Sequence, residues 1–136
     1  MPVETTYNPL KARFEIDVSQ RLDASGIAFG LETVLSHPEW KEGKPRLIRI
    51  ARDTDLSGLT LEAYERDVVP VLDRHKDKLK SRPKAAIVCP NYAHEVVMWL
   101  YENVPAIRQS SEFKVFPTEA DAELFLSEHG ALSASK

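Results

Sequence analysis

The sequence predicts an α/β fold of two layers, in which a five-stranded, mostly parallel sheet with an antiparallel first strand packs against four helices, mainly on one face. Short runs of strand-like character alternate with longer stretches of helical periodicity along the chain. One run, residues 84–90, has small or apolar residues on both alternating faces and ends in a proline. Because a strand covered on both faces has this pattern, we place it in the middle of the sheet.

The first two strands are expected to form an antiparallel hairpin. Residues 8–11 have turn chemistry, with a proline at the second position, and they separate strands at 5–7 and 13–19. The second strand alternates strictly between apolar and polar residues, which indicates that one face is buried. Taken in order, the strands are expected at 5–7, 13–19, 46–51, 84–90 and 112–117, and the helices at 24–36, 61–82, 91–104 and 118–129.

Each predicted helix has a suitable N-cap residue, and three of the four have a stop signal. A side chain that accepts a hydrogen bond from a free backbone N–H precedes each helix, and these residues are Asp23, Thr60, Asn91 and Thr118. Pro38 and Pro105 follow the first and third helices, and Gly130 is expected just past the last one. Pro70 lies inside the second helix and predicts a kink or a break there.

Charged residues from three strands are expected to share one sheet face. Glu15, Asp17, Arg49 and Lys114 each alternate with apolar neighbours. If the helices wind to one side, these residues form a solvated, mixed-charge face on which opposite charges pair across strands.

Length and composition indicate one soluble domain over residues 1–130, with 131–136 as a disordered polar tail. The chain has 136 residues, 43% of them hydrophobic, and a net charge of -3, which gives no broad attraction to nucleic acid. No apolar run approaches the roughly 20 residues of a membrane span, and the N-terminus lacks the features of a secretory signal. With a single cysteine, we expect a cytoplasmic protein without disulfides.

Three stretches, residues 36–44, 53–60 and 113–126, show a similarity that runs from about residue 7 to 128. The chain resembles the SpoIIAA-like branch of the STAS superfamily, whose domains have the β-β-α-β-α-β-α-β-α order. The best understood relatives are non-enzymatic switches in sigma-factor control that bind a kinase-type partner and are phosphorylated on a serine. Others of similar fold bind nucleotides or lipids. The resemblance therefore implies a binding or regulatory domain that acts through protein–protein contacts.

The same resemblance draws attention to Ser57, because the antagonists have a similar Asp-Ser-Ser-Gly-Leu sequence at a helix start. Phosphate at a helix N-terminus meets free N–H groups, and the added charge disrupts a protein contact. This chain has Leu56 at the first serine position, and Thr60 offers a cap three residues after Ser57. The alternative is that the Ser-Gly pair is only a turn.

An enzymatic alternative depends on Cys89, Asn91 and His94, at the carboxyl end of a strand, where α/β folds place ligands. A helix beginning at Asn91 would lower the thiol pKa, and His94 would act as the base. The competing interpretation is that Cys89 packs in the core. The histidines at 37, 75, 94 and 129 lack metal-ligand spacing, and no cofactor is expected.

The helix at 91–104 also suggests a partner surface. Its inward stripe is already complete without Val96, Met98 and Trp99, so these residues make the helix apolar nearly all round. If Trp99 is exposed, a homodimer is the first expectation; alternatively, Trp99 packs under residues 105–111. A small apolar or lipid-like ligand held between the helices and the sheet is a further alternative, and it requires a cavity.

Overall fold

A computed structural model describes residues 3–41 and 43–134 of the chain. The strands are β1 (Val3–Asn8), β2 (Arg13–Val18), β3 (Arg46–Ile50), β4 (Lys84–Val88) and β5 (Glu112–Phe116). The helices are α1 (Ala24–Leu35), α2 (Leu61–Asp67), α3 (Val69–Arg74), the short 3₁₀ helix η1 (Lys76–Leu79), α4 (Asn91–Asn103), α5 (Pro105–Ser110) and α6 (Glu119–Ala134). The predicted α/β class is confirmed.

The strands form one five-stranded sheet in the order β1-β2-β3-β4-β5. As predicted, β1 pairs antiparallel with β2, and all later neighbours pair in parallel. The prediction that residues 84–90 occupy the middle of the sheet is wrong, because β3 lies there and β4 lies between β3 and the edge strand β5. The apolar pattern of β4 did correctly indicate that both faces of this strand are covered.

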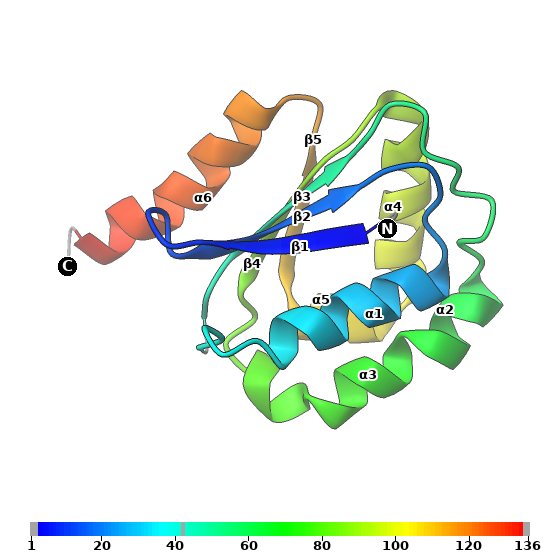
Figure 1. The fold of residues 1–136 in the computed structure, drawn as a ribbon, viewed down its shortest axis with the longest axis horizontal. Helices are drawn as coiled ribbons and strands as arrows, with labels where there is room; N and C mark the ends of the chain where they lie inside the picture. Colours follow the sequence, from blue (N-terminus) through cyan, green and yellow to red (C-terminus); the bar gives the residue numbers. More distant parts are fainter. Residues whose placement is uncertain (1–2, 42, 135–136) are drawn as a thin grey trace.

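Helices cover the two faces of the sheet unequally. Figure 1 shows α1 to α5 on one side of the sheet and α6 on the other. The larger core lies under α1 to α5, and a smaller one joins α6 to β3 and β4 through Leu47, Ala86, Ala122, Phe125 and Leu126. The one-sided layering therefore holds for every described helix except α6. Helix α6 covers the second face because Leu47 and Ala86 lie on that charged face. Both are fully buried, which requires a covering element.

The predicted pairing of charges across strands forms on this face, but the face is not wholly solvated as predicted, because α6 covers part of it. Arg49 lies 2.8 Å from a carboxylate oxygen of Glu15 and 3.3 Å from one of Asp17. Glu123 of α6 accepts two hydrogen bonds from the buried Arg13, at 2.7 and 2.6 Å. Ion pairs and the small apolar core together hold α6 on this face.

Several predicted helix boundaries are confirmed. Asp23 Oδ1 accepts a hydrogen bond from the N–H of Gly26 at 2.9 Å, and Thr60 Oγ1 accepts one from Ala63 at 3.1 Å. The predicted interruption near Pro70 separates α2 from α3 at Val68, where the proline ring prevents continuous helical hydrogen bonding.

Three other boundaries differ from the prediction. Pro90, not Asn91, occupies the cap position of α4, and Asn91 is the first residue of the helix. Pro105 ends α4 but also begins α5, because proline is favoured in the first turn of a helix. Gly130 lies within α6, which continues to Ala134. The expected tail at 131–136 therefore begins inside this helix, and residues 135–136 lie outside the described residues.

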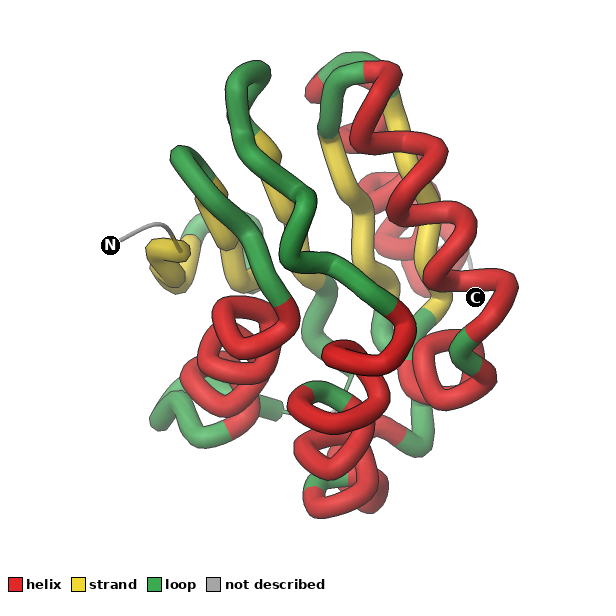
Figure 2. The backbone as a smooth tube through the Cα atoms, turned by 90° about the vertical axis from the view of Figure 1, so that its right-hand side faces the viewer, coloured by secondary structure: helices red, strands yellow, loops and turns green. Residues whose placement is uncertain are grey.

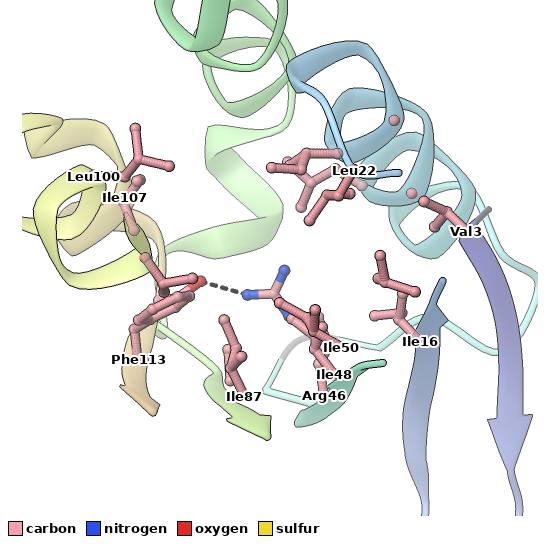
Figure 3. A pocket seen from close by; sticks show the side chains of 18 of the residues that line it. Val3, Ile16, Leu22, Arg46, Ile48, Ile50, Ile87, Leu100, Ile107 and Phe113 are labelled. Atoms are coloured by element: carbon pink, nitrogen blue, oxygen red, sulfur yellow. Dashed lines mark hydrogen bonds between the residues drawn. The ribbon is translucent and has the colours of Figure 1, made fainter. Parts of the chain in front are cut away.

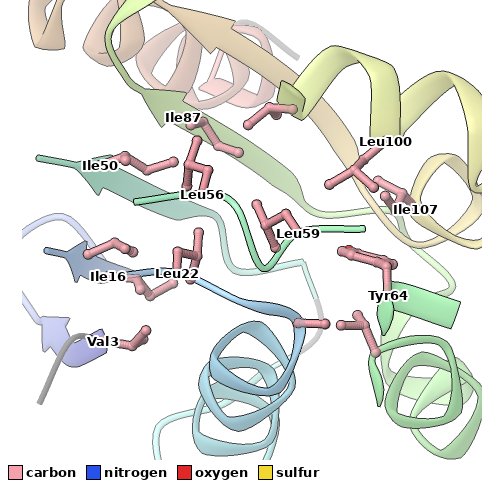
Figure 4. Close-up of a cluster of buried hydrophobic side chains, with 14 of the residues drawn as sticks. Val3, Ile16, Leu22, Ile50, Leu56, Leu59, Tyr64, Ile87, Leu100 and Ile107 are labelled. Atoms are coloured by element: carbon pink, nitrogen blue, oxygen red, sulfur yellow. The ribbon is translucent and has the colours of Figure 1, made fainter. Parts of the chain in front are cut away.

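The loops after β2 and β3 run side by side at the carboxyl ends of the parallel strands (Figure 2). A β-bridge joins Arg21 to Asp55, and the N–H of Leu22 donates to the carbonyl of Asp55 at 2.9 Å. A Cβ atom added at Gly58 would lie 2.7 Å from the Cβ of Asp23, so the two loops touch where only glycine fits. Leu56 and Leu59 of the second loop are buried in the core beneath it (Figure 4).

Candidate functional site

A cavity of about 130 Å³ lies between the sheet and the layer formed by α1 to α5 (Figure 3). An engineered apolar cavity of about 150 Å³ in another protein binds benzene, and this cavity is of similar size. The lining is almost entirely aliphatic and comes from both layers; it includes Val3, Ile16, Val18, Leu22, Ile27, Leu31, Val34, Ile48, Ile50, Ile87, Leu100 and Ile107.

The cavity accounts for incomplete burial on the inner face of the sheet. Ile48 on the middle strand and Phe113 on β5 both face the helix layer, yet both are only half-buried. On the helix side, Gly26 and Gly30 of α1 also line the cavity. A Cβ added at Gly30 would lie 3.4 Å from a methyl carbon of Val3, which is an ordinary van der Waals distance, so α1 and the end of β1 are close neighbours here.

Arg46, the first residue of β3, points from the sheet into this apolar space (Figure 3). Its exposure is only 6%. The side chain donates a hydrogen bond from Nη2 to Ser111 Oγ, while Nε has no acceptor among the described residues. None of the ion pairs in residues 3–41 and 43–134 includes Arg46. Burial lowers the pKa of Arg46 to about 10, so the guanidinium remains protonated at neutral pH.

A buried cation without a carboxylate partner is costly, because desolvation of an ion costs several kcal/mol even after the protein relaxes. The polar groups near Arg46 are neutral. Tyr64 lines the same cavity, and burial raises the pKa of its hydroxyl, which makes no hydrogen bond within the described part of the chain. Ser110 also lines the cavity and donates from Oγ to the carbonyl of Ile107 at 3.1 Å. The site therefore combines an apolar wall with one positive charge.

The residues of the enzymatic alternative lie in different environments. Cys89 is buried in the core, and burial raises the pKa of its thiol to about 11, although a reactive cysteine requires a lowered pKa. His94 is exposed on α4, and no hydrogen bond joins it to Cys89 among the described residues. Asn91 begins α4, but its side chain lies outside the described part of the structure.

Ser57 is exposed in a turn before α2, whose cap is Thr60. Its N–H donates to Asp55 Oδ1 at 2.9 Å, and this backbone hydrogen bond is the main reason that the pKa of Asp55 is lowered. The serine is thus accessible but does not stand at the helix start, as the resemblance to the antagonist motif would require.

The outer side of α4 presents aromatic residues. Trp99 is 45% exposed and Tyr92 is 47% exposed, while Val96 and Met98 are half-buried. The spacing of residues 92, 96 and 99 places them along one side of the helix. Residues 105–111 form α5 and its C-cap, and they leave nearly half of the Trp99 side chain exposed.

Sequence reasoning missed Arg46, and it gave a cavity between the helices and the sheet only as an alternative, without naming the residues that line it. Arg46 alternates with Ile48 and Ile50, so strand periodicity alone places it on the inner face, whereas Arg49 falls on the outer one. The sequence therefore offered one indication of this site, namely an arginine on the same face of a strand as two isoleucines.

Sheet order, layering and connections together define an α/β domain with a SpoIIAA-like fold. Among solved structures, the chain is similar to an uncharacterized protein from the DUF3478 family with a SpoIIAA-like fold, from Shewanella loihica PV-4, with 21% sequence identity, a TM-score of 0.52 and 91% of each chain covered. This similarity confirms the predicted resemblance at the level of the fold. No protein-family model matches the chain. No curated protein matches it either.

Two features are absent from the described residues. None of their helices has both the length and the apolar character needed to cross a membrane. Within the same residues, no group of three or more histidine, cysteine, aspartate or glutamate side chains is arranged to hold a metal ion.

Proposed function

We propose that this chain is a non-enzymatic binding domain of the cytoplasm that holds a small apolar ligand between its sheet and its helix layer. The observation that supports this function is the aliphatic cavity of about 130 Å³, since protein interiors generally contain few voids larger than a water molecule. Filling such a space gains free energy by removing apolar surface from water and by restoring contacts that the lining side chains lack.

The non-enzymatic part of the proposal is supported by the side chains around the cavity. Ligand sites in enzymes bring a nucleophile or a base together with a group that orients it. The lining consists mostly of aliphatic residues, with one arginine, one tyrosine, one phenylalanine, two serines and two glycines, and Ser111 already accepts a hydrogen bond from Arg46. This composition favours holding a molecule over converting it.

Titration of methyl-labelled protein with toluene tests the proposal. Toluene is expected to shift the methyl signals of Ile48, Ile87 and Leu100, because all three line the cavity. Ala85→Leu adds three carbon atoms inside the cavity and should weaken toluene binding at least tenfold. Ala51→Leu adds the same atoms at an exposed position and serves as the control. Absence of these shifts up to the solubility limit of toluene would overturn the proposal.

A second candidate function is a STAS-like regulatory domain that acts through protein–protein contacts, with a second copy of the chain as the first partner to test. The exposed Trp99 and Tyr92 on one side of α4 favour it. Light scattering at increasing concentration should then show a dimer, and Trp99→Ser should return it to a monomer. A wild-type chain that stays monomeric at high concentration would exclude self-association through this helix.

Within this second candidate, Ser57 remains the proposed switch residue. Because the side chain is exposed, Ser57→Asp should leave the melting temperature nearly unchanged, whereas it should weaken the partner contact. Ser57→Ala is the matched control and should associate like the wild type. Equal association of all three proteins would remove Ser57 from the regulatory proposal.

A further inference from the structure

The guanidinium of Arg46 gives the cavity a chemical preference that the aliphatic lining does not explain. An arginine has five N–H donors in a planar fork. Ser111 accepts from one nitrogen, and Nε has no acceptor among the described residues. A purely structural link to Ser111 would need only one donor and no charge, so most of the donor capacity of Arg46 is available to a molecule in the cavity.

The position of Arg46 directs those donors toward a ligand. In the sheet register Arg46 lies between Phe14 on β2 and Ala85 on β4, and neither side chain accepts a hydrogen bond. The side chain extends from this inner face toward the helix layer, among residues that include Ile87, Ile48 and Leu22 (Figure 3). Charged and apolar parts of the site are therefore adjacent within one cavity.

A planar anion with two oxygen atoms satisfies a guanidinium best, because two parallel N–H···O bonds form at once. The remaining wall offers little to a second charged or strongly polar group, which would be desolvated without compensation. A single carboxylate on an otherwise apolar body is the chemistry that matches both parts of the site.

Resting on the proposed apolar-ligand function, we propose that the cavity selects an apolar molecule with one carboxylate, which pairs with Arg46 while the body of the molecule contacts the aliphatic lining. Binding then brings together two opposite charges and gives Nε an acceptor. The hydroxyl of Tyr64, which lines the same cavity, is a second donor available to the carboxylate.

Benzoate and benzamide test this selectivity, because they have the same shape and differ in charge. Hydrogen bonds to charged groups contribute enough for benzoate to bind wild-type protein about 10- to 100-fold more tightly in a methyl NMR titration. Arg46→Met should abolish this preference while toluene binding persists. Arg52→Met removes the same charge from an exposed loop and should preserve the preference.

The outcomes separate this inference from the function on which it rests. Equal affinities of benzoate and benzamide for the wild-type protein, with toluene still bound, would overturn the carboxylate preference and leave the apolar site intact. Failure of all three compounds to bind would overturn both. If Arg46→Met does not fold, the wild-type affinity ratio still decides, and Arg46→Lys, which keeps the charge, should still favour benzoate over benzamide.

Discussion

Replacing Arg46 by methionine should make the protein more stable, although the arginine is buried and hydrogen-bonded. Burial lowers its pKa from the ordinary value to about 10, which corresponds to about 3 kcal/mol of cost to the protonated form. The substitution removes this cost and loses the hydrogen bond from the charged guanidinium to Ser111, a loss of about 2 kcal/mol. Methionine is unbranched and adapts to the space that the arginine stem leaves. The free energy of unfolding should therefore rise by about 1 kcal/mol.

Urea denaturation followed by circular dichroism measures this change, and the melting temperature should rise on the order of 4 °C. Arg52→Met is the matched control, since its side chain is exposed and its effect should stay within about 0.5 kcal/mol. A gain in stability on removing Arg46 would mean that the residue is kept at a cost, as expected of a binding group. A loss of 1 kcal/mol or more would refute this reasoning and assign Arg46 a structural role.

Three further predictions concern the core, the loop contact and the second face of the sheet. Cys89→Ala should lower the free energy of unfolding by about 1 kcal/mol. Iodoacetamide should alkylate Cys89 in the folded wild type slowly until the pH nears 11, and rapid reaction at neutral pH would contradict a core role. Gly58→Ala forces a Cβ to 2.7 Å from Asp23 and should cost about 1–3 kcal/mol in urea denaturation, so an unchanged midpoint would show that the loops separate easily. Hydrogen bonds from Arg13, above all, lower the pKa of Glu123 from 4.5 to about 2, so the stabilisation is present above pH 4.5 and is lost as the pH falls toward 2. This contribution is at most about 3 kcal/mol, and Glu123→Gln should make the acid dependence of stability shallower; an identical pH profile would refute it.

Much of the fold follows from local patterns in the sequence. Residues 13–18 alternate because one face of β2 meets the core and the other presents Glu15 and Asp17 to Arg49. Helix starts at Asp23 and Thr60 were predictable because a cap depends on one side chain and the N–H groups of the next turn. Such features involve few residues that are close in sequence.

The layering and the cavity depend on residues that are far apart. The position of α6 follows from Leu47 and Ala86, two small apolar contributions from different strands that become one surface only after the strands pair. The cavity is what remains between side chains of several strands and helices, so no single run of sequence specifies its volume. The inward position of Arg46, in contrast, was visible in the sequence, because Arg46 alternates with Ile48 and Ile50. It was not predicted because a charged residue at a strand end usually faces water.

The most direct test of the proposed binding site locates a bound carboxylate by NMR. Intermolecular nuclear Overhauser effects from benzoate protons are expected to the methyl groups of Ile48, Ile87 and Leu100, all of which line the cavity around Arg46. Effects confined to the exposed face of α4 around Trp99, or none at saturating benzoate, would contradict a binding site between the sheet and the helix layer.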